Sequence, residues 1–147
     1  MIGDGDYRPG TYAVYGGHAY RTGGSRAILP RITLLREAPD PVPAGLQPYP
    51  AAPERAYFVH PTQLEAWYAT SAEFTWKGGR FTVLSVADGR VTGMYQGSNR
   101  PFPALNELER VDKYEYVGTF PPAEVENLAE DRVDLLARWH AEQAEAR

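Results

Sequence analysis

Residues 11–21 read Thr-Tyr-Ala-Val-Tyr-Gly-Gly-His-Ala-Tyr-Arg, and they carry the clearest fold signal in the chain. Aromatic and β-branched residues alternate with smaller ones around the pair Gly16-Gly17. Alternation with a period of two indicates a strand buried on one face, and two glycines suit the positive φ angles of a tight hairpin turn. The stretch therefore predicts a β-hairpin.

A second hairpin signal follows 61 residues later, where residues 73–77 and 80–84 flank Gly78-Gly79. Shifting the chain against itself by 61 places residues of like chemistry on one another: Tyr15 on Trp76, Gly17 on Gly78, Tyr20 on Phe81, Val59 on Phe120, Pro61 on Pro122, Leu64 on Val125, Glu65 on Glu126 and Trp67 on Leu128. Because one offset holds across two separated blocks, the pattern predicts an internal repeat.

Each repeat is expected to contain several short strands and one helical turn. Further strands are predicted at 31–35, 57–59, 91–95 and 114–117, with a turn at Asp88-Gly89. The proline-led stretches 61–67 and 122–128 predict a short helical turn near the end of each repeat, with Leu64 and Trp67 on one face and Val125 and Leu128 repeating that spacing.

This element order predicts a mainly β (α+β) chain, and it resembles tandem SH3-like small β-barrels. The repeat predicts a first unit at 10–68 and a second unit at 70–128, and residues 1–9 are expected to form a flexible leader.

Two segments stand apart from the predicted strands. Residues 37–55 contain six prolines, which favour an extended surface loop; the alternative is a polyproline ligand for another domain. Residues 129–147 predict an acidic C-terminal helix that begins near Glu130, with an apolar stripe of Val133, Leu136 and His140. That stripe is expected to pack on the β units, and the alternative is a helix that docks on a partner.

The chain has 147 residues and a formal charge of −4, all of which falls in residues 121–147. Nucleic-acid-binding domains usually carry a basic excess, so this charge argues against nucleic acid as the main partner. No apolar run approaches the roughly 18–20 residues that span a bilayer, and the N-terminus is acidic rather than signal-like. We therefore expect a cytoplasmic protein with no membrane partner.

Residues able to do chemistry are scattered. The chain has no cysteine, and His18, His60 and His140 show no metal-binding spacing, so the sequence predicts neither a metal site nor a cofactor. One enzyme-like set remains as an alternative. Arg21, Ser71 and Glu124-x-Glu126 resemble the Arg–Ser–Glu set of ADP-ribosyltransferases, which implies that Glu126 would hold the nicotinamide ribose while Glu124 assists the acceptor. A related alternative is a small-molecule or enzymatic site in the cleft between the two β units, formed by Arg21, His60, Glu124 and Glu126.

Aromatic residues make up 12% of the chain, more than two small barrels can bury. Tyrosine and tryptophan are enriched at protein interfaces, so some are expected to form a binding surface. The candidates are Tyr12, Tyr15, Tyr95, Asn99, Arg100, Tyr114 and Trp139. Size and composition are similar to those of small bacterial immunity proteins of polymorphic toxin systems. This resemblance implies a non-enzymatic protein that binds and neutralises a toxin through an aromatic and acidic surface.

Overall fold

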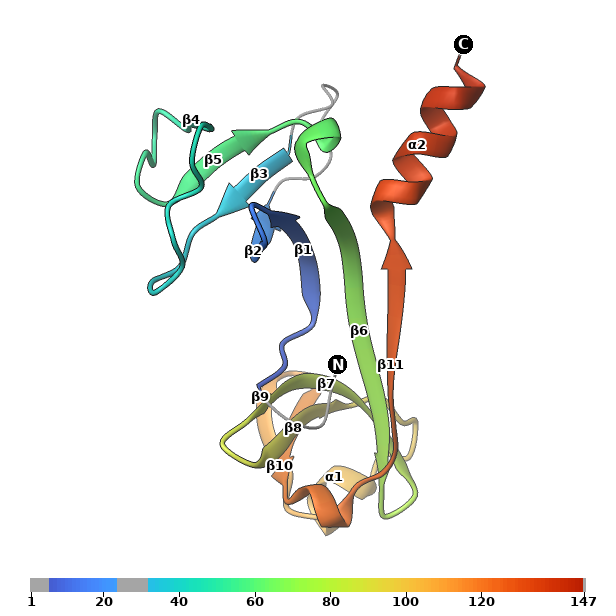
Figure 1. Ribbon diagram of the computed structural model, residues 1–147. Helices are drawn as coiled ribbons and strands as arrows, with labels where there is room; N and C mark the ends of the chain where they lie inside the picture. The colour runs from blue at the N-terminus through green and yellow to red at the C-terminus, as the bar shows by residue number, and fades with distance from the viewer. Residues whose placement is uncertain (1–5, 24–31, 147) are drawn as a thin grey trace. The chain divides into compact units, whose positions relative to one another are not determined.

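The computed structural model describes residues 6–23 and 32–146, which form open antiparallel sheet with 51% strand, 16% helix and a C-terminal helix. The prediction of a mainly β chain is therefore confirmed. The described residues make two compact units (Figure 1). The first unit contains residues 10–70 and 132–146, apart from 24–31, and the second contains residues 6–9 and 71–131.

The first unit is a sheet in the order β4-β5-β3-β2-β1-β6. Its elements are β1 (Gly10–Tyr15), β2 (His18–Gly23), β3 (Ile32–Leu35), β4 (Gln47–Pro48), β5 (Ala56–Val59), the 3-10 turn η1 (Pro61–Gln63), the first part of β6 (Ala66–Trp76) and α2 (Leu135–Glu145). The helix follows directly from β11 (Glu126–Asp134), whose last residues also belong to this unit.

The second unit is a sheet in the order β6-β7-β8-β10-β9, and β11 pairs with β6. Its elements are the last part of β6, β7 (Gly79–Ala87), β8 (Arg90–Tyr95), α1 (Phe102–Leu105), β9 (Glu109–Asp112), β10 (Glu115–Phe120), the 3-10 turn η2 (Pro122–Glu124) and most of β11. Both proline-led segments thus contain a single helical turn followed by a strand. The expectation that Leu64 and Trp67 share a helical face is wrong, because Trp67 already lies in β6.

Strand pairing follows the same pattern in both units. Tyr12 of β1 pairs with Arg21 of β2, and 61 residues further on Glu73 of β6 pairs with Thr82 of β7. The pairing of β2 with β3 corresponds to that of β7 with β8. Residues of β2 match β7 at an offset of 61, and residues of β3 match β8 at an offset of 59, so that the pair Thr22–Leu34 corresponds to Val83–Gly93. The order of strands and the turn before the last strand therefore correspond throughout.

The first hairpin turn falls on Gly16-Gly17 as predicted, but the second turn lies one residue earlier than its sequence prediction. Gly16 and Gly17 have φ angles of 59° and 79°, but in the second unit the equivalent angles belong to Lys77 at 48° and Gly78 at 80°. Gly79, expected in the turn, instead begins β7. A Cβ atom at Gly79 would lie 2.6 Å from Cζ of Phe102, so this glycine serves side-chain packing rather than the turn.

Each unit has its own hydrophobic core. In the first unit the core contains Ala13, Tyr20, Ile32, Leu34, Leu46, Tyr57, Val59 and Leu64. In the second unit it contains Tyr7, Ala72, Phe74, Trp76, Phe81, Val83, Val91, Phe102 and Phe120. The second core is built largely from aromatic rings, several of which stack or meet edge to face.

Two terminal segments differ from their predictions. The C-terminal helix begins at Leu135 rather than near Glu130, because residues 126–134 form β11 and pair with β6. The Asp134 side chain caps the helix by accepting a hydrogen bond from the Ala137 N–H at 2.9 Å.

Within the expected leader, Tyr7 is buried and exchanges two backbone hydrogen bonds with Val86, so residue 7 is part of the second unit. Residues 1–5 of that leader lie outside the described residues. No helix in the described parts of the chain is long and apolar enough to cross a membrane.

Candidate functional site

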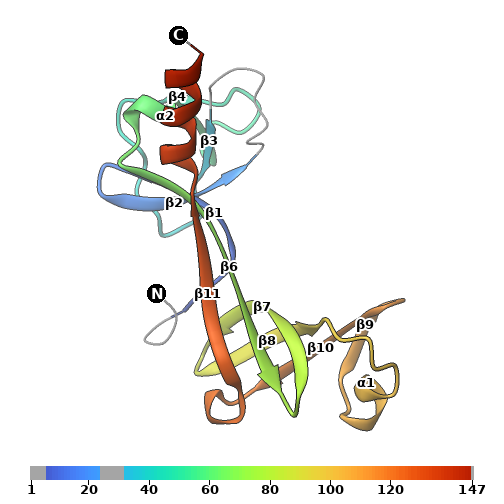
Figure 2. The same ribbon diagram turned by 90° about the vertical axis from the view of Figure 1, so that its right-hand side faces the viewer.

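The connection between β8 and β10 in the second unit presents the most exposed apolar side chains. It contains α1 and the β9–β10 hairpin, which lie together in Figure 2. Leu105 is 77% exposed, Val111 52% and Tyr114 80%. We define the hairpin surface as these three residues together with the neighbouring carboxylates Glu107, Glu109, Asp112 and Glu115.

Buried residues of α1 hold the hairpin surface in place. The ring of Phe102 is buried and stacks on Tyr95 with centroids 4.7 Å apart. It lies against Gly79, where the missing Cβ leaves room for it. Pro103 is also buried. This anchoring places Leu105 at the end of α1 on the solvent side, so the apolar exposure belongs to an ordered segment.

Val111 sits at a bulge in the edge strand β9. Glu115 pairs with Asp112 and Tyr116 pairs with Arg110, which leaves Val111 as the extra residue. A bulge interrupts the row of backbone donors and acceptors that an added strand would need. The surface is therefore suited to contact through side chains rather than to strand addition.

The charge around the hairpin surface is negative. Residues 71–131 contain ten acids and six Lys or Arg, and residues 107–115 contain four acids and two. Both local cations lie close to neighbouring groups: Arg110 Nε donates to the Asp112 carbonyl at 3.3 Å, and Lys113 Nζ lies 5.5 Å from the Tyr114 ring centroid. An apolar patch in a negative field attracts a partner with a basic surface.

The corresponding connection of the first unit, between β3 and β5, also exposes apolar side chains. Val42 is 58% exposed and Tyr49 41%. Of the six exposed large hydrophobic residues among those that the structure describes, five lie in these two connections, and the sixth is Leu84 of β7. Apolar exposure is thus concentrated at one equivalent place in each unit.

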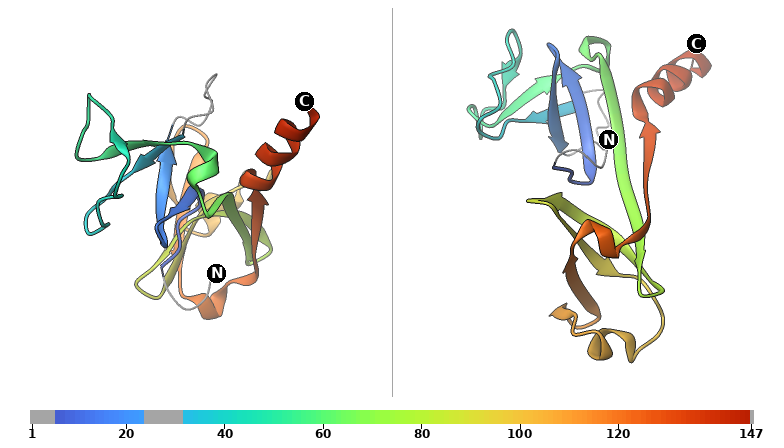
Figure 3. Two further views of the ribbon diagram at one scale, coloured as in Figure 1. Left: turned by 45° about the horizontal axis from the view of Figure 1, so that its top comes forward. Right: turned by 60° about the horizontal axis from the view of Figure 1, so that its bottom comes forward.

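This connection, residues 36–55, extends from β3 and β5 (Figure 3) and is tied to the first core. The Tyr20 hydroxyl donates to the Pro41 carbonyl at 2.8 Å, and the Tyr15 hydroxyl donates to the Ala44 carbonyl. Leu46 is itself part of the core. Burial, and secondarily the charge of Asp40, raise the pKa of Tyr20, which keeps its hydroxyl protonated as a donor. The proline-rich segment predicted as a surface loop is therefore held at several points.

Asp40 organises the start of this connection. Its carboxylate accepts from the Glu37 N–H at 3.0 Å and lies 2.9 Å from Nε2 of His18. Burial is the largest single influence, and it raises the pKa of Asp40. Several influences together outweigh it and lower this pKa: the hydrogen bonds from Glu37 and His18, and the charges of His18 and Arg36. The pKa of Asp40 consequently lies below its ordinary value.

We expect Asp40→Asn to lower the free energy of unfolding of the first unit by about 1.5–3 kcal/mol at pH 7, the usual range for a hydrogen bond to a charged group. A lowered folded-state pKa stabilises the protein above the ordinary carboxyl pKa, and this stability is lost as the pH falls through the folded value. The difference between the two proteins should therefore vanish in acid. Urea unfolding between pH 2 and pH 7 measures it, with the exposed Glu54→Gln as control; an equal difference at all pH values would contradict the role of the Asp40 charge.

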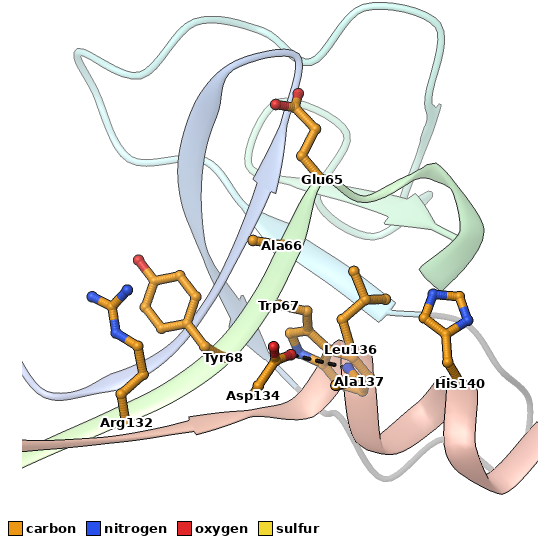
Figure 4. A pocket seen from close by; sticks show the side chains of 9 residues that line it. All are labelled: Glu65, Ala66, Trp67, Tyr68, Arg132, Asp134, Leu136, Ala137 and His140. Carbon is orange, nitrogen blue, oxygen red and sulfur yellow. Dashed lines mark hydrogen bonds between the residues drawn. The ribbon is translucent and has the colours of Figure 1, made fainter.

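The first unit also contains a groove between β6 and α2, with a volume of about 370 Å³ (Figure 4). Glu65, Trp67, Tyr68, Arg132 and His140 are among its lining residues. Two of its carboxylates are already bonded: Glu65 accepts from the Gly17 N–H at 2.7 Å, and Asp134 caps α2. Among the described residues, the indole N–H of Trp67 is a buried donor without a partner.

Beside this groove, four side chains form a row across neighbouring strands. Arg21 lies 5.6 Å from the centroid of Tyr12, which stacks on Tyr68 at 5.9 Å, and Arg132 lies 4.1 Å from the Tyr68 centroid. Tyr12 pairs in register with both Arg21 and Tyr68. Such cross-strand cation–π and aromatic contacts stabilise a sheet, and this row accounts for the position of Tyr12 without a ligand.

The seven predicted binding residues divide between the two units. Tyr12, Tyr15 and Trp139 belong to the first unit, and Tyr95, Asn99, Arg100 and Tyr114 belong to the second. Tyr15 and Tyr95 pack against the cores, and Trp139 meets the ring of His60 edge to face at 5.6 Å. Asn99, Arg100 and Tyr114 are exposed and lie in the β8–β10 connection.

Sequence reasoning missed Leu105, Val111, Val42 and Tyr49. They could have been found as apolar residues that lie next to prolines or charged residues in a segment between predicted strands.

The residues of the alternative enzymatic sites have separate local partners. Arg21 faces Glu37 at 3.8 Å, and the His60 ring bonds within η1 to Thr62. In the second unit, Glu124 lies 3.4 Å from the Trp76 indole nitrogen, and the Glu126 carbonyl accepts from Thr75. Ser71 is an exposed residue of β6. Arg21, His60 and Glu124 thus make local side-chain contacts within their units, and Glu126 makes one through its backbone.

Comparison with known proteins finds no match: no protein-family model, no curated protein and no solved structure matches this chain. The surfaces of the chain itself are therefore the guide to its function.

Proposed function

We propose that this chain is a non-enzymatic protein-binding module of the immunity type, which binds and neutralises a basic toxin domain. The single observation that carries the proposal is the hairpin surface, where Leu105, Val111 and Tyr114 are more than half exposed within a negatively charged segment. Exposed large apolar side chains that occur together in one connection are candidates for an interaction site. Tyrosine is among the residues that contribute most to binding energy, and acidic neighbours speed association with a basic partner.

We also propose that the two units are SH3-like barrels that arose by duplication. The corresponding strand registers support this proposal, as does the 3-10 turn before the last strand of each unit. The side-chain sizes in the two cores also support it. The small Ala13 of the first unit corresponds to the large Phe74 of the second, and the large Leu34 of the first unit corresponds to Gly93 of the second. Duplicated units that repack independently would keep total volume in this way.

The binding proposal can be tested from the position of Tyr114. A photoreactive p-benzoylphenylalanine at position 114, expressed in the cells that encode the protein, should cross-link one basic protein. The same probe at Leu84, the exposed apolar residue of β7 outside both connections, should not capture it. The captured protein, expressed alone, should arrest growth, and co-expression of this chain should restore growth. A partner whose expression is harmless would refute the immunity role, and the absence of any position-specific partner would refute the binding role.

For that partner, Tyr114→Ala should weaken binding about 30-fold, since truncating an interface hot spot costs about 2 kcal/mol or more. Leu84→Ala should leave the affinity unchanged. Because both side chains are exposed, neither variant should alter thermal unfolding by more than a small amount. Isothermal titration calorimetry at two salt concentrations measures the affinity, which should fall as salt screens the acidic surface.

A further inference from the structure

We infer that α2 is a detachable strap on the first unit. It leaves the edge of β6 and unfolds at a much smaller cost in free energy than the sheet of that unit, and its release uncovers the side chain of Trp67. This conformational device lies outside the hairpin surface and goes beyond the proposed function.

In the closed state, α2 and the start of β6 line the two sides of the groove in Figure 4. Leu136 and His140 of α2 are among its lining residues, as are residues 65–68. The half-buried Trp67 packs against the first core and also lines this groove. The strap therefore contributes to shielding Trp67 from solvent.

The packing of α2 is light. None of the residues Leu135–Glu145 is buried, and its apolar side chains Leu135, Leu136 and Trp139 are half-buried. By contrast, Leu34 in the sheet of the same unit is completely buried. Because hydrophobic stabilisation scales with the apolar area removed from water, the docking of α2 contributes much less free energy than the packing of the sheet. Elements with few buried apolar contacts are those that open locally.

The helix also has little support of its own. It is 11 residues long, and isolated helices shorter than about 12–15 residues are only marginally stable in water. Its first turn has no acid and its last turn has no base, while Glu142 and Glu145 lie near the C-terminal end, where negative charge is unfavourable. Apart from the Asp134 cap, α2 therefore depends on docking, so its release and its unfolding occur together.

Trp139 is the anchor of the strap. Its ring meets that of His60 edge to face, with centroids 5.6 Å apart. His60 is a fixed seat, because its ring bonds to the Thr62 hydroxyl at 2.8 Å and its N–H donates to Gln63 Oε1 at 2.9 Å. Leu136 lies three residues before Trp139, on the same face of the helix.

The closed state carries a penalty at Trp67. Its indole N–H is a buried donor that has no acceptor among the described residues. A buried donor without a partner is unfavourable, whereas the same group in water is hydrogen-bonded. Hydration of this group on release offsets part of the apolar contact that the strap loses.

Hydrogen exchange of the full-length chain, followed residue by residue by NMR, tests the inference. Relative to their rates in an unfolded chain, amides of α2 should be protected about 100-fold less than those of β2 and β3, as for a locally opening element. The indole N–H of Trp67 should exchange in step with α2, because release uncovers it.

Two substitutions separate the strap from the sheet. Trp139→Ala should speed exchange of α2 and of the Trp67 indole about tenfold and leave β2 and β3 unchanged, whereas its exposed neighbour Arg138→Ala should change neither by more than about twofold. Ile32→Val, in the first core, should speed exchange of β2 and β3 about fivefold without affecting α2.

The inference is refuted if α2 is as protected as the strands, or if each substitution speeds both sets of amides equally, since α2 would then unfold with the sheet. Exchange of α2 at the unfolded rate would refute docking. An α2 that is insensitive to Trp139→Ala would refute the anchor, and a Trp67 indole that exchanges with the strands would refute the uncovering.

Discussion

Replacing Phe81 by alanine is expected to lower the free energy of unfolding of the second unit by about 3–5 kcal/mol, the range for truncating a buried phenylalanine. The Phe81 side chain is completely buried. Its ring lies 5.1 Å from that of Phe74 and 5.4 Å from that of Phe120, centroid to centroid, and it also meets Trp76, Tyr95 and Phe102. Removing it leaves a cavity among rings that cannot all shift to fill it.

Urea unfolding followed by the fluorescence of Trp76 measures this loss, in a background where Trp67 and Trp139 are replaced by phenylalanine. Trp76 packs in the same core as Phe81, so its emission reports on the second unit. Leu84→Ala on the same strand is the matched control, and it should change stability by about 0.5 kcal/mol or less because Leu84 is partly exposed. Equal effects of the two substitutions would contradict the core assigned to the second unit.

Gly93→Ala is expected to destabilise the second unit by about 1–3 kcal/mol or more, as overpacking a filled core does. A Cβ atom at position 93 would lie 2.5 Å from Cε1 of Phe74 and 3.1 Å from the Thr82 carbonyl oxygen. The Phe74 ring is confined between Phe81 and Phe120, so it cannot move aside. The penalty comes from this steric conflict, since the added methyl group has no free space.

A second substitution distinguishes steric conflict from a loss of backbone freedom. Phe74→Leu removes the ring that meets the new methyl group, so it should cost less in the Gly93→Ala background than in the wild type. The double-mutant cycle should give a favourable coupling of about 0.5–3 kcal/mol, as expected for residues in direct contact. Additive effects would show that Phe74 is not what excludes a side chain at position 93.

Much of the fold could be predicted from local sequence because tight turns depend on a few residues. Gly16-Gly17 and Asp88-Gly89 adopt the positive φ angles that their sequences favour, and the flanking strands follow. The Lys77-Gly78 turn shows the limit of this reasoning. Gly78-Gly79 looks like the equivalent pair, but Gly79 is needed in β7, where the Phe102 ring leaves no room for a side chain.

The candidate surface was only partly accessible to sequence reasoning. Tyr114 was among the predicted residues, and the structure gives it the highest exposure of any large hydrophobic residue that it describes. Tyr15 and Tyr95 were predicted with it, yet both pack against cores. Sequence could not separate these tyrosines, because exposure depends on which residues another segment covers.

The amino-acid sequence by itself determined the local elements: alternating strands, glycine turns and proline-led helical turns, all of which depend on interactions between near neighbours. Only the tertiary structure decided that residues 126–134 pair with β6 as a strand, and that α2 starts at Leu135. It also decided where the apolar exposure of each unit falls, in the connections that contain Tyr49 and Tyr114. The physical reason is that strand partners and burial are set by residues distant in sequence, which no local pattern specifies.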